Sequence, residues 1–190
     1  MTVFFDIDTQ NDFVLPAGAL YVPGAERILP AVVRLNQCAP LVVSTVDAHC
    51  ECEDEFHDWP PHCVAGCIGQ QKPSATLLPD RVVVGTKPGL PSISGARQIL
   101  LEKRKLDLFS NPNLPQLLVN LNADEYVVYG VVTEYCVRHA ALGLARWGKP
   151  VTLVTDAIRA IDDAPAEAMF REFRALGGRF STVDALCPLM

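Results

Sequence analysis

Short apolar runs rich in β-branched residues recur along the chain and alternate with segments of helical periodicity. We expect the runs to form strands, because continuous apolar runs are typical of parallel strands that are buried on both faces. The expected strands are Thr2–Asp8, Leu41–Asp47, Arg81–Gly85, Tyr126–Val131 and Val151–Thr155.

Three segments carry apolar residues at helical spacing, and glycines end two of them at Gly148 and Gly177. Residues 98–109 fit either a strand or a helical turn, and periodicity does not separate these alternatives. The alternation of strands and helices predicts an α/β fold with a parallel sheet covered on both faces, and residues 1–190 are expected to form one domain. The expected helices are Ala25–Gln37, Glu134–Trp147 and Ala164–Leu176.

Composition narrows the class of protein. The 190 residues carry a net charge of −6 without a basic cluster, which argues against nucleic acid as a partner. The N-terminus lacks a basic region followed by a long apolar segment, and no apolar run approaches the roughly 20 residues of a membrane span. A soluble, cytoplasmic protein is expected. The seven cysteines are therefore expected to be thiols rather than disulfides.

Chemically active side chains follow three of the expected strands. Asp8 ends the first, Asp47 ends the second with His49 just beyond, and Cys136 follows Tyr126–Val131. Because ligands bind beyond the carboxyl ends of parallel strands, these side chains are expected to converge at one edge of the sheet.

The stretch VVTEYCV favours a nucleophilic thiol at a strand-to-helix turn. Thr133 stands where a helix N-cap is expected, which places Cys136 in the first turn, where the helix dipole favours a thiolate. Asp8, partly desolvated at a strand end, could accept the thiol proton. The alternatives are a small buried apolar role for Cys136 and a turn-capping role for Asp8.

The stretch VDAHCECEDEFHDWPPHC, residues 46–63, offers metal ligands. Asp47, His49 and His62 form a carboxylate–imidazole set that suits Zn²⁺, Fe²⁺ or Mn²⁺ with open coordination positions, and His57 is a further candidate. A solvated loop is one alternative. A thiolate zinc site is the other, built from Cys50, Cys52, Cys63 and Cys67.

Together these motifs resemble those of the isochorismatase-like cysteine hydrolases, and among them nicotinamidases. DIDTQNDF (6–13) resembles the family's opening motif, residues 46–63 resemble the nicotinamidase metal segment, and GVVTEYCV (130–137) resembles the nucleophile turn. The resemblance implies a three-layer α/β/α sandwich with a six-stranded, mainly parallel sheet. It also implies that QILLEK is a strand and that the enzyme is a cytoplasmic homo-oligomer of NAD salvage.

The resemblance further implies an Asp-Lys-Cys triad of Asp8, Lys103 and Cys136. Lys103 matches the family's strand-end lysine that is followed six residues later by Phe. Lys87 in GTKPG is the rival and Lys105 a lesser one.

The implied reaction is hydrolysis of a small carboxamide through a thioester, most simply nicotinamide to nicotinate and ammonia. The family pattern places a cis peptide bond before Val132, an oxyanion site at the N–H groups of Val132 and Cys136, and aromatic side chains at Phe13 and Trp59 that flank the substrate ring. The implied cofactor is a divalent metal ion, with Zn²⁺ favoured, and the partner is a small amide.

The loop between His49 and His62 is shorter than nicotinamidases usually have: it is the twelve residues 50–61. Because of this shorter loop, the alternative function is that of a related cysteine hydrolase that acts on another small amide or on a carbamoyl or ureido compound. Three other classes remain as alternatives. A vinyl-ether hydrolase needs no thiol nucleophile, yet Cys136 is present, and a non-catalytic binding module needs no Asp-Lys-Cys triad. A Cys-rich metal-storage or redox protein would have no amidase activity. The acidic residues of this loop include Glu51, Glu53, Asp54 and Glu55.

Overall fold

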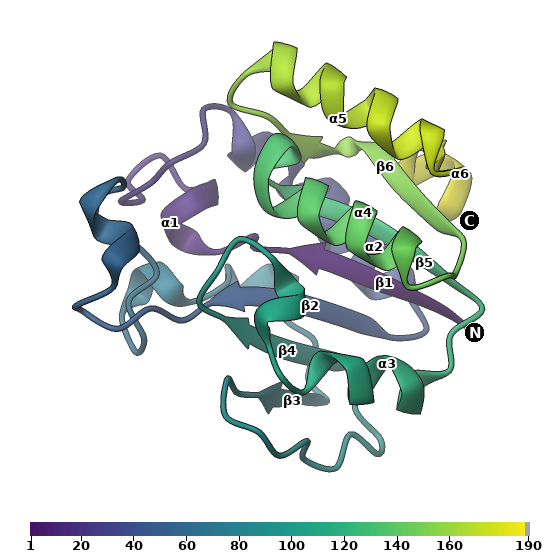
Figure 1. The fold of residues 1–190 in the computed structure, drawn as a ribbon, viewed down its shortest axis with the longest axis horizontal. Helices are drawn as coiled ribbons and strands as arrows, with labels where there is room; N and C mark the ends of the chain where they lie inside the picture. Colours follow the sequence, from purple (N-terminus) through teal and green to yellow (C-terminus); the bar gives the residue numbers. More distant parts are fainter. Residues whose placement is uncertain (189–190) are drawn as a thin grey trace.

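The computed structural model describes residues 1–188. Within them, seven strands form one parallel sheet in the order β3-β4-β2-β1-β5-β6-β7 (Figure 1). The strands are β1 (Thr2–Ile7), β2 (Val42–Asp47), β3 (Arg81–Val84), β4 (Gln98–Lys103), β5 (Glu125–Val131), β6 (Val151–Arg159) and β7 (Arg179–Ser181).

The predicted α/β architecture is confirmed, with one strand more than the six expected. Each apolar run forms a strand, and QILLEK forms β4, as the resemblance implied. The extra strand, β7, has only three residues, too few to give an apolar run. β6 continues four residues beyond its predicted end at Thr155, because the exposed residues Thr155 and Asp156 interrupt its apolar run without ending the strand.

Helices cover both faces of the sheet (Figure 1). On one face, α3 (Leu114–Leu121), α4 (Arg138–Arg146) and α5 (Asp163–Ala175) share an apolar cluster with Phe5 of β1. On the other, α2 (Leu29–Cys38) and α6 (Val183–Leu186) share a second cluster with Phe4, the neighbouring residue. This alternation is the two-residue period of a strand. Among the described residues, no helix has the length and apolar character to cross a membrane.

Two predicted helices begin differently from the expectation. The first starts as a 3₁₀ turn, Ala25–Ile28, and becomes α-helical only where Pro30 occupies its first turn, a position that tolerates the missing N–H of proline. The second starts as a π-helical turn, Thr133–Val137, before α4. The short helix α3 was not predicted.

The order in which strands are added to the sheet reverses at β1. Strands β2, β4 and β3 lie on one side of β1, and β5, β6 and β7 lie on the other. Gly130 allows β5 to come close to β1, because a Cβ added there would lie 2.1 Å from the carbonyl oxygen of Ile7. A crevice beyond the carboxyl ends of β1 and β5 follows, since ligands of open α/β sheets bind at such a switch point.

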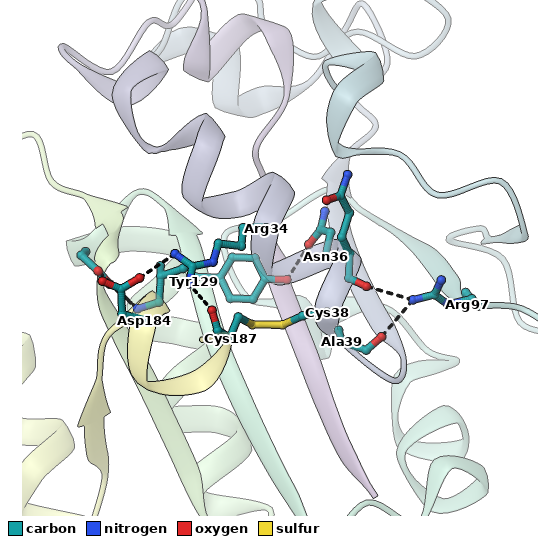
Figure 2. Close-up of a disulfide and its surroundings, with 11 residues drawn as sticks. Arg34, Asn36, Cys38, Ala39, Arg97, Tyr129, Asp184 and Cys187 are labelled. Carbon is teal, nitrogen blue, oxygen red and sulfur yellow. Dashed lines mark hydrogen bonds and ion pairs between the residues drawn. A yellow bond between two sulfur atoms is a disulfide. The ribbon is translucent and has the colours of Figure 1, made fainter. Parts of the chain in front are cut away.

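A disulfide between Cys38 and Cys187 corrects the expectation that all cysteines are thiols (Figure 2). It joins the end of α2 to the segment after α6. Beside it Arg34 forms an ion pair with Asp184 at 2.6 Å and donates a hydrogen bond to the carbonyl oxygen of Cys187. The two cysteines are 149 residues apart, so only the tertiary fold brings them together. The other five cysteines of residues 1–188 are free.

A buried polar network lies between α2 and the sheet, centred on the carboxylate of Asp6. Lys72 Nζ lies 3.0 Å from Asp6 Oδ2, and Thr9 Oγ1 donates to Asp6 Oδ1 at 2.7 Å. Asn36 and Ser44 donate the remaining hydrogen bonds, at 3.1 and 3.2 Å. Asp6 is fully buried and Lys72 is 5% exposed, so each charge depends on the other.

We predict that Lys72→Met lowers the free energy of unfolding by about 3–5 kcal/mol, because it leaves the Asp6 charge buried without a counterion. Urea denaturation measures the change. The double variant Asp6→Asn, Lys72→Met should regain part of the loss. Lys87→Met, at an exposed position, is the control and should stay within about 0.5 kcal/mol of the parent. Equal stability of Lys72→Met and Lys87→Met would contradict the prediction.

Candidate active site

A cleft opens at the carboxyl ends of β1, β2 and β5, where the chain changes direction across the sheet. The empty space of the cleft and its open mouth together is about 470 Å³. Asp8, Asp47 and Cys136 face it from three different strand ends, as the sequence predicted. Its walls are mainly apolar and include Phe13, Leu20, Val22, Trp59, Leu106 and Ile161.

The ammonium group of Lys103 lies behind the cleft, at the end of β4. Nζ lies 2.8 Å from Asp8 Oδ2 and 2.5 Å from Asp47 Oδ1, and it donates to Cys136 Sγ at 3.7 Å. Asp47 and Lys103 are register partners in β2 and β4, so strand pairing itself holds them together. Lys103 is 1% exposed, whereas its rivals Lys87 and Lys105 are both exposed.

Asp8 is held by the neighbouring strand. Its backbone N–H donates to Thr45 Oγ1 at 3.1 Å, and the same hydroxyl donates to Asp8 Oδ1 at 2.6 Å. Asp8 has a φ of 47°, in the left-handed region that aspartate tolerates better than most residues. The turn directs the carboxylate toward Lys103 and Cys136. Thr45 is a site residue that sequence reasoning missed.

Cys136 lies in the π-helical turn, and Thr133 does not cap it. The capping position belongs to Val132, and Thr133 Oγ1 is buried without a hydrogen-bond partner among the described residues. The peptide bond between Val131 and Val132 is cis, as the resemblance implied. Cys136 is 6% exposed.

The resting thiol differs from the thiolate that the helix dipole suggested. Burial raises the pKa of Cys136 well above its usual value, and the carboxylates of Asp8 and Asp47 add to the rise, although Lys103 opposes it. The thiol is therefore protonated before a substrate binds. Desolvation outweighs the helix dipole here because the side chain has almost no contact with water.

The three charged groups around the thiol change one another's pKa values. Burial raises the pKa of Asp8 more than Lys103 lowers it. Burial also acts to raise the pKa of Asp47, but Lys103 and His49 together hold it below its usual value. For Lys103 burial favours the neutral form, yet the two carboxylates outweigh it and raise its pKa. The result is a permanent cation between Asp47 and a carboxylate that accepts protons more readily than usual.

Asp47, His49 and His62 form a candidate metal centre beside this cluster. One ligand atom from each lies within 4.8 Å of the other two, and all three side chains are buried. His62 Nδ1 lies 2.8 Å from the Pro60 carbonyl oxygen, which leaves Nε2 free to bind a cation. Both ring nitrogens of His49 are buried without a hydrogen-bond partner in the described part of the chain. A metal ion would satisfy one of them, so the residues fit the group.

The backbone around these ligands is fixed by side chains of the opening motif. Gln10 accepts from the Asp47 N–H at 2.7 Å and donates to the Asp47 carbonyl oxygen at 2.9 Å. Asp12 accepts from the N–H of Cys63, next to His62, at 2.7 Å. The motif therefore positions the metal segment as well as Asp8.

Aromatic side chains lie in the cleft, and one of them packs against the candidate centre. Phe13 lies 5.4 Å from the His62 ring, measured between centroids, and Trp59 packs edge-on against Tyr135 at 5.8 Å. Both predicted aromatic residues, Phe13 and Trp59, line the cleft, as does Val132. Tyr135 was missed, because nothing in its sequence context separates a cleft position from a core position.

Other candidates lie outside the centre. His57 is exposed and does not belong to the set. Among the described residues no second group of three potential ligands forms, so the four-cysteine alternative is not assembled. Glu55 was not predicted, yet it lines the cleft, and its Oε1 lies 3.8 Å from His62 Nε2.

Comparison with known proteins identifies the family. The Isochorismatase domain matches residues 2–185. The chain belongs to the isochorismatase family. Nicotinamidase of Acinetobacter baylyi is 26% identical over 176 residues, which cover 82% of this chain and 80% of that protein.

Two solved structures extend the comparison within the isochorismatase family. PnC1 from L. infantum, solved in complex with nicotinate, superposes with a TM-score of 0.82 at 26% identity, covering 97% of this chain and 94% of that one. Pyrazinamidase of Pyrococcus horikoshii, solved in complex with zinc, gives a TM-score of 0.77 at 26% identity, covering 95% and 98%. Both match the fold over nearly its whole length.

We predict that His49→Ala loses tightly bound metal, whereas the double variant Cys50→Ser, Cys52→Ser retains it. Removing an imidazole takes one of three ligands, but the two thiols do not belong to the set. Inductively coupled plasma mass spectrometry after dialysis measures the metal content of each protein. Retention by the His49 variant together with loss by the cysteine variant would move the site to the thiols.

Proposed function

We propose that this chain is a metal-dependent cysteine amidohydrolase that converts nicotinamide to nicotinate and ammonia. The observation that carries the proposal is the position of Lys103 Nζ, 2.8 Å from Asp8, 3.7 Å from Cys136 and 2.5 Å from Asp47. One cation thus contacts the proposed base, the proposed nucleophile and a proposed metal ligand. Family membership and the relatives named nicotinamidase support the same reaction.

Asp8 is the general base of the proposed reaction. It accepts the thiol proton of Cys136, and the thiolate attacks the carboxamide carbon of the substrate. Lys103 keeps the negative charge paired throughout, because its ammonium group lies beside Asp8 before the transfer and beside the sulfur after it. The raised pKa of Asp8 makes it a stronger base than an ordinary carboxylate.

The tetrahedral intermediate needs hydrogen-bond donors for its oxyanion. In the proposal, the N–H groups of Val132 and Cys136 supply them, at the cis peptide and the π-helical turn. Asp8 then returns its proton to the departing ammonia and activates the water that hydrolyses the thioester. Cys136 regains its proton from Asp8 at the end of the cycle.

Asp47, His49 and His62 would hold the divalent metal ion, which we propose to be Zn²⁺, with Fe²⁺ and Mn²⁺ as the alternatives. A bound ion with open positions supplies a Lewis acid that can orient a ring nitrogen. Phe13 and Trp59, which line the cleft, flank the ring in this proposal. Residues 1–190 would form one hydrolase domain.

A second candidate substrate class is favoured by Glu55. Its carboxylate reaches the cleft from the short acidic loop and could accept hydrogen bonds from a carbamoyl or ureido group. Ammonia release from nicotinamide, pyrazinamide, carbamoyl amino acids and ureido compounds, each with and without chelator, distinguishes the two classes. Fastest turnover of a ureido compound would replace nicotinamide as the proposed substrate.

We predict that Cys136→Ala abolishes ammonia release without unfolding the protein. Loss of a nucleophile should remove more than about 3 kcal/mol of transition-state stabilisation, a rate loss above about a hundredfold. The matched control is Cys67→Ala, an exposed thiol outside the cleft, which should keep the parent rate. Circular dichroism checks the fold of both, and near-parent activity of the Cys136 variant would exclude the thioester mechanism.

We predict that Asp8→Asn is nearly as damaging, because asparagine keeps the shape of the side chain but cannot accept the thiol proton. Groups that act as one unit show non-additive losses. The double variant Asp8→Asn, Cys136→Ala should therefore have the rate of Cys136→Ala alone. A clear further loss in the double variant would show that the two residues act independently.

A further inference from the structure

Two thiols lie together just outside the candidate metal centre. Cys50 Sγ and Cys52 Sγ are 3.2 Å apart. Cys52 is exposed and Cys50 is partly exposed, and neither lines the cleft. The proposed amidase reaction uses neither of them, although Cys50 directly follows His49.

We propose that Cys50 and Cys52 form a modification site, at which a low-molecular-weight disulfide such as oxidised glutathione converts them into an intramolecular disulfide. The sulfur atoms need to approach by only about 1.2 Å to reach the bond length of about 2.0 Å. A displacement of this size lies within the freedom of a surface turn.

The exchange balances with oxidised glutathione as the oxidant. The Cys52 thiol attacks one glutathione sulfur, so that a Cys52–glutathione bond forms, the glutathione disulfide breaks, and one glutathione leaves as a thiol with the Cys52 proton. Cys50 then attacks Cys52 Sγ, and the second glutathione leaves with the Cys50 proton. Two protein thiols are oxidised and one glutathione disulfide is reduced.

Exposure makes the exchange selective. The bulky oxidant can reach Cys52 at the surface, whereas Cys63 is fully buried and Cys136 is 6% exposed. Cys67 is exposed as well, but the structure records no thiol contact for it among the described residues. It could form a mixed disulfide with glutathione but has no neighbour with which to close a ring.

Ring closure acts on the turn that supports His49. The backbone of His49 is fixed on both sides, since its N–H donates to Cys63 at 3.1 Å and its carbonyl accepts from Ala65 at 2.9 Å. The turn after Cys50 therefore takes up the movement. That turn carries Glu53, whose Oε1 accepts from the Cys50 N–H at 3.3 Å and lies 3.9 Å from His49 Nδ1.

Displacing Glu53 would remove the carboxylate behind a proposed metal ligand. At 3.9 Å this carboxylate is not yet hydrogen-bonded to His49 Nδ1, but a small side-chain movement would let it orient the imidazole. Loss of an orienting partner commonly weakens metal binding by about tenfold or more. Arg104 couples the same turn to β4, because it forms an ion pair with Glu53, donates to Cys50 Sγ at 3.4 Å and directly follows Lys103. Oxidation of the two thiols should therefore loosen the metal.

The first test is the disulfide itself. The metal-loaded protein is treated with oxidised glutathione, its free thiols are alkylated, and peptides are analysed by mass spectrometry. We expect Cys50 and Cys52 to become linked and dithiothreitol to restore both thiols. Cys67→Ser should behave like the parent, and Cys52→Ser should form no ring. A glutathione adduct that persists on Cys52 while Cys50 stays free would overturn the proposal.

The second test is the rate of metal transfer to a chromogenic chelator. Oxidised parent protein should release metal about tenfold faster than reduced protein, and the double variant Cys50→Ser, Cys52→Ser should show no difference between the two treatments. Equal rates for oxidised and reduced parent protein would overturn the link to His49. The rate of metal release depends on the proposed metal site. The mass-spectrometric detection of the disulfide does not depend on that site.

Discussion

The ammonium group of Lys103 lies between two buried carboxylates, and the arrangement of the site depends on it. Without this cation Asp8 and Asp47 would face each other as unpaired charges in a space that excludes water. Its position depends in turn on sheet register, because Asp47 and Lys103 are partners across β2 and β4. A slip of one residue would direct Lys103 to the opposite face of the sheet.

Much of this arrangement could be predicted from local pattern. Asp8, Asp47 and Cys136 follow apolar runs, and the convergence of parallel strand ends brings them together. Lys103 could not be found in this way, because QILLEK has no decisive periodicity and any lysine is by default a surface residue. The resemblance to a family selected it, and burial now separates it from the exposed side chains of Lys87 and Lys105.

The features that the sequence did not reveal are those that depend on tertiary contacts. Cys38 and Cys187 are 149 residues apart, and no spacing rule joins them. Nothing in the sequence singles out Lys72, and only the fold places it 3.0 Å from Asp6. The predicted start of the helix after β5 was wrong for a related reason: local propensity favoured Thr133 as a cap, but the chain forms a π-helical turn that begins at Thr133, with Val132 in the capping position.

The electrostatics of the cleft explain how a protonated thiol can serve as a nucleophile. Burial raises the pKa of Cys136 and that of Asp8 alike. Proton transfer therefore depends on the difference between these two pKa values. Lys103 contacts both, at 3.7 and 2.8 Å, and its charge stabilises the anion whichever group carries it. It can do so because Asp47 keeps it protonated. The carboxylate that belongs to the candidate metal centre thus also maintains the cation on which the proposed thiol chemistry depends.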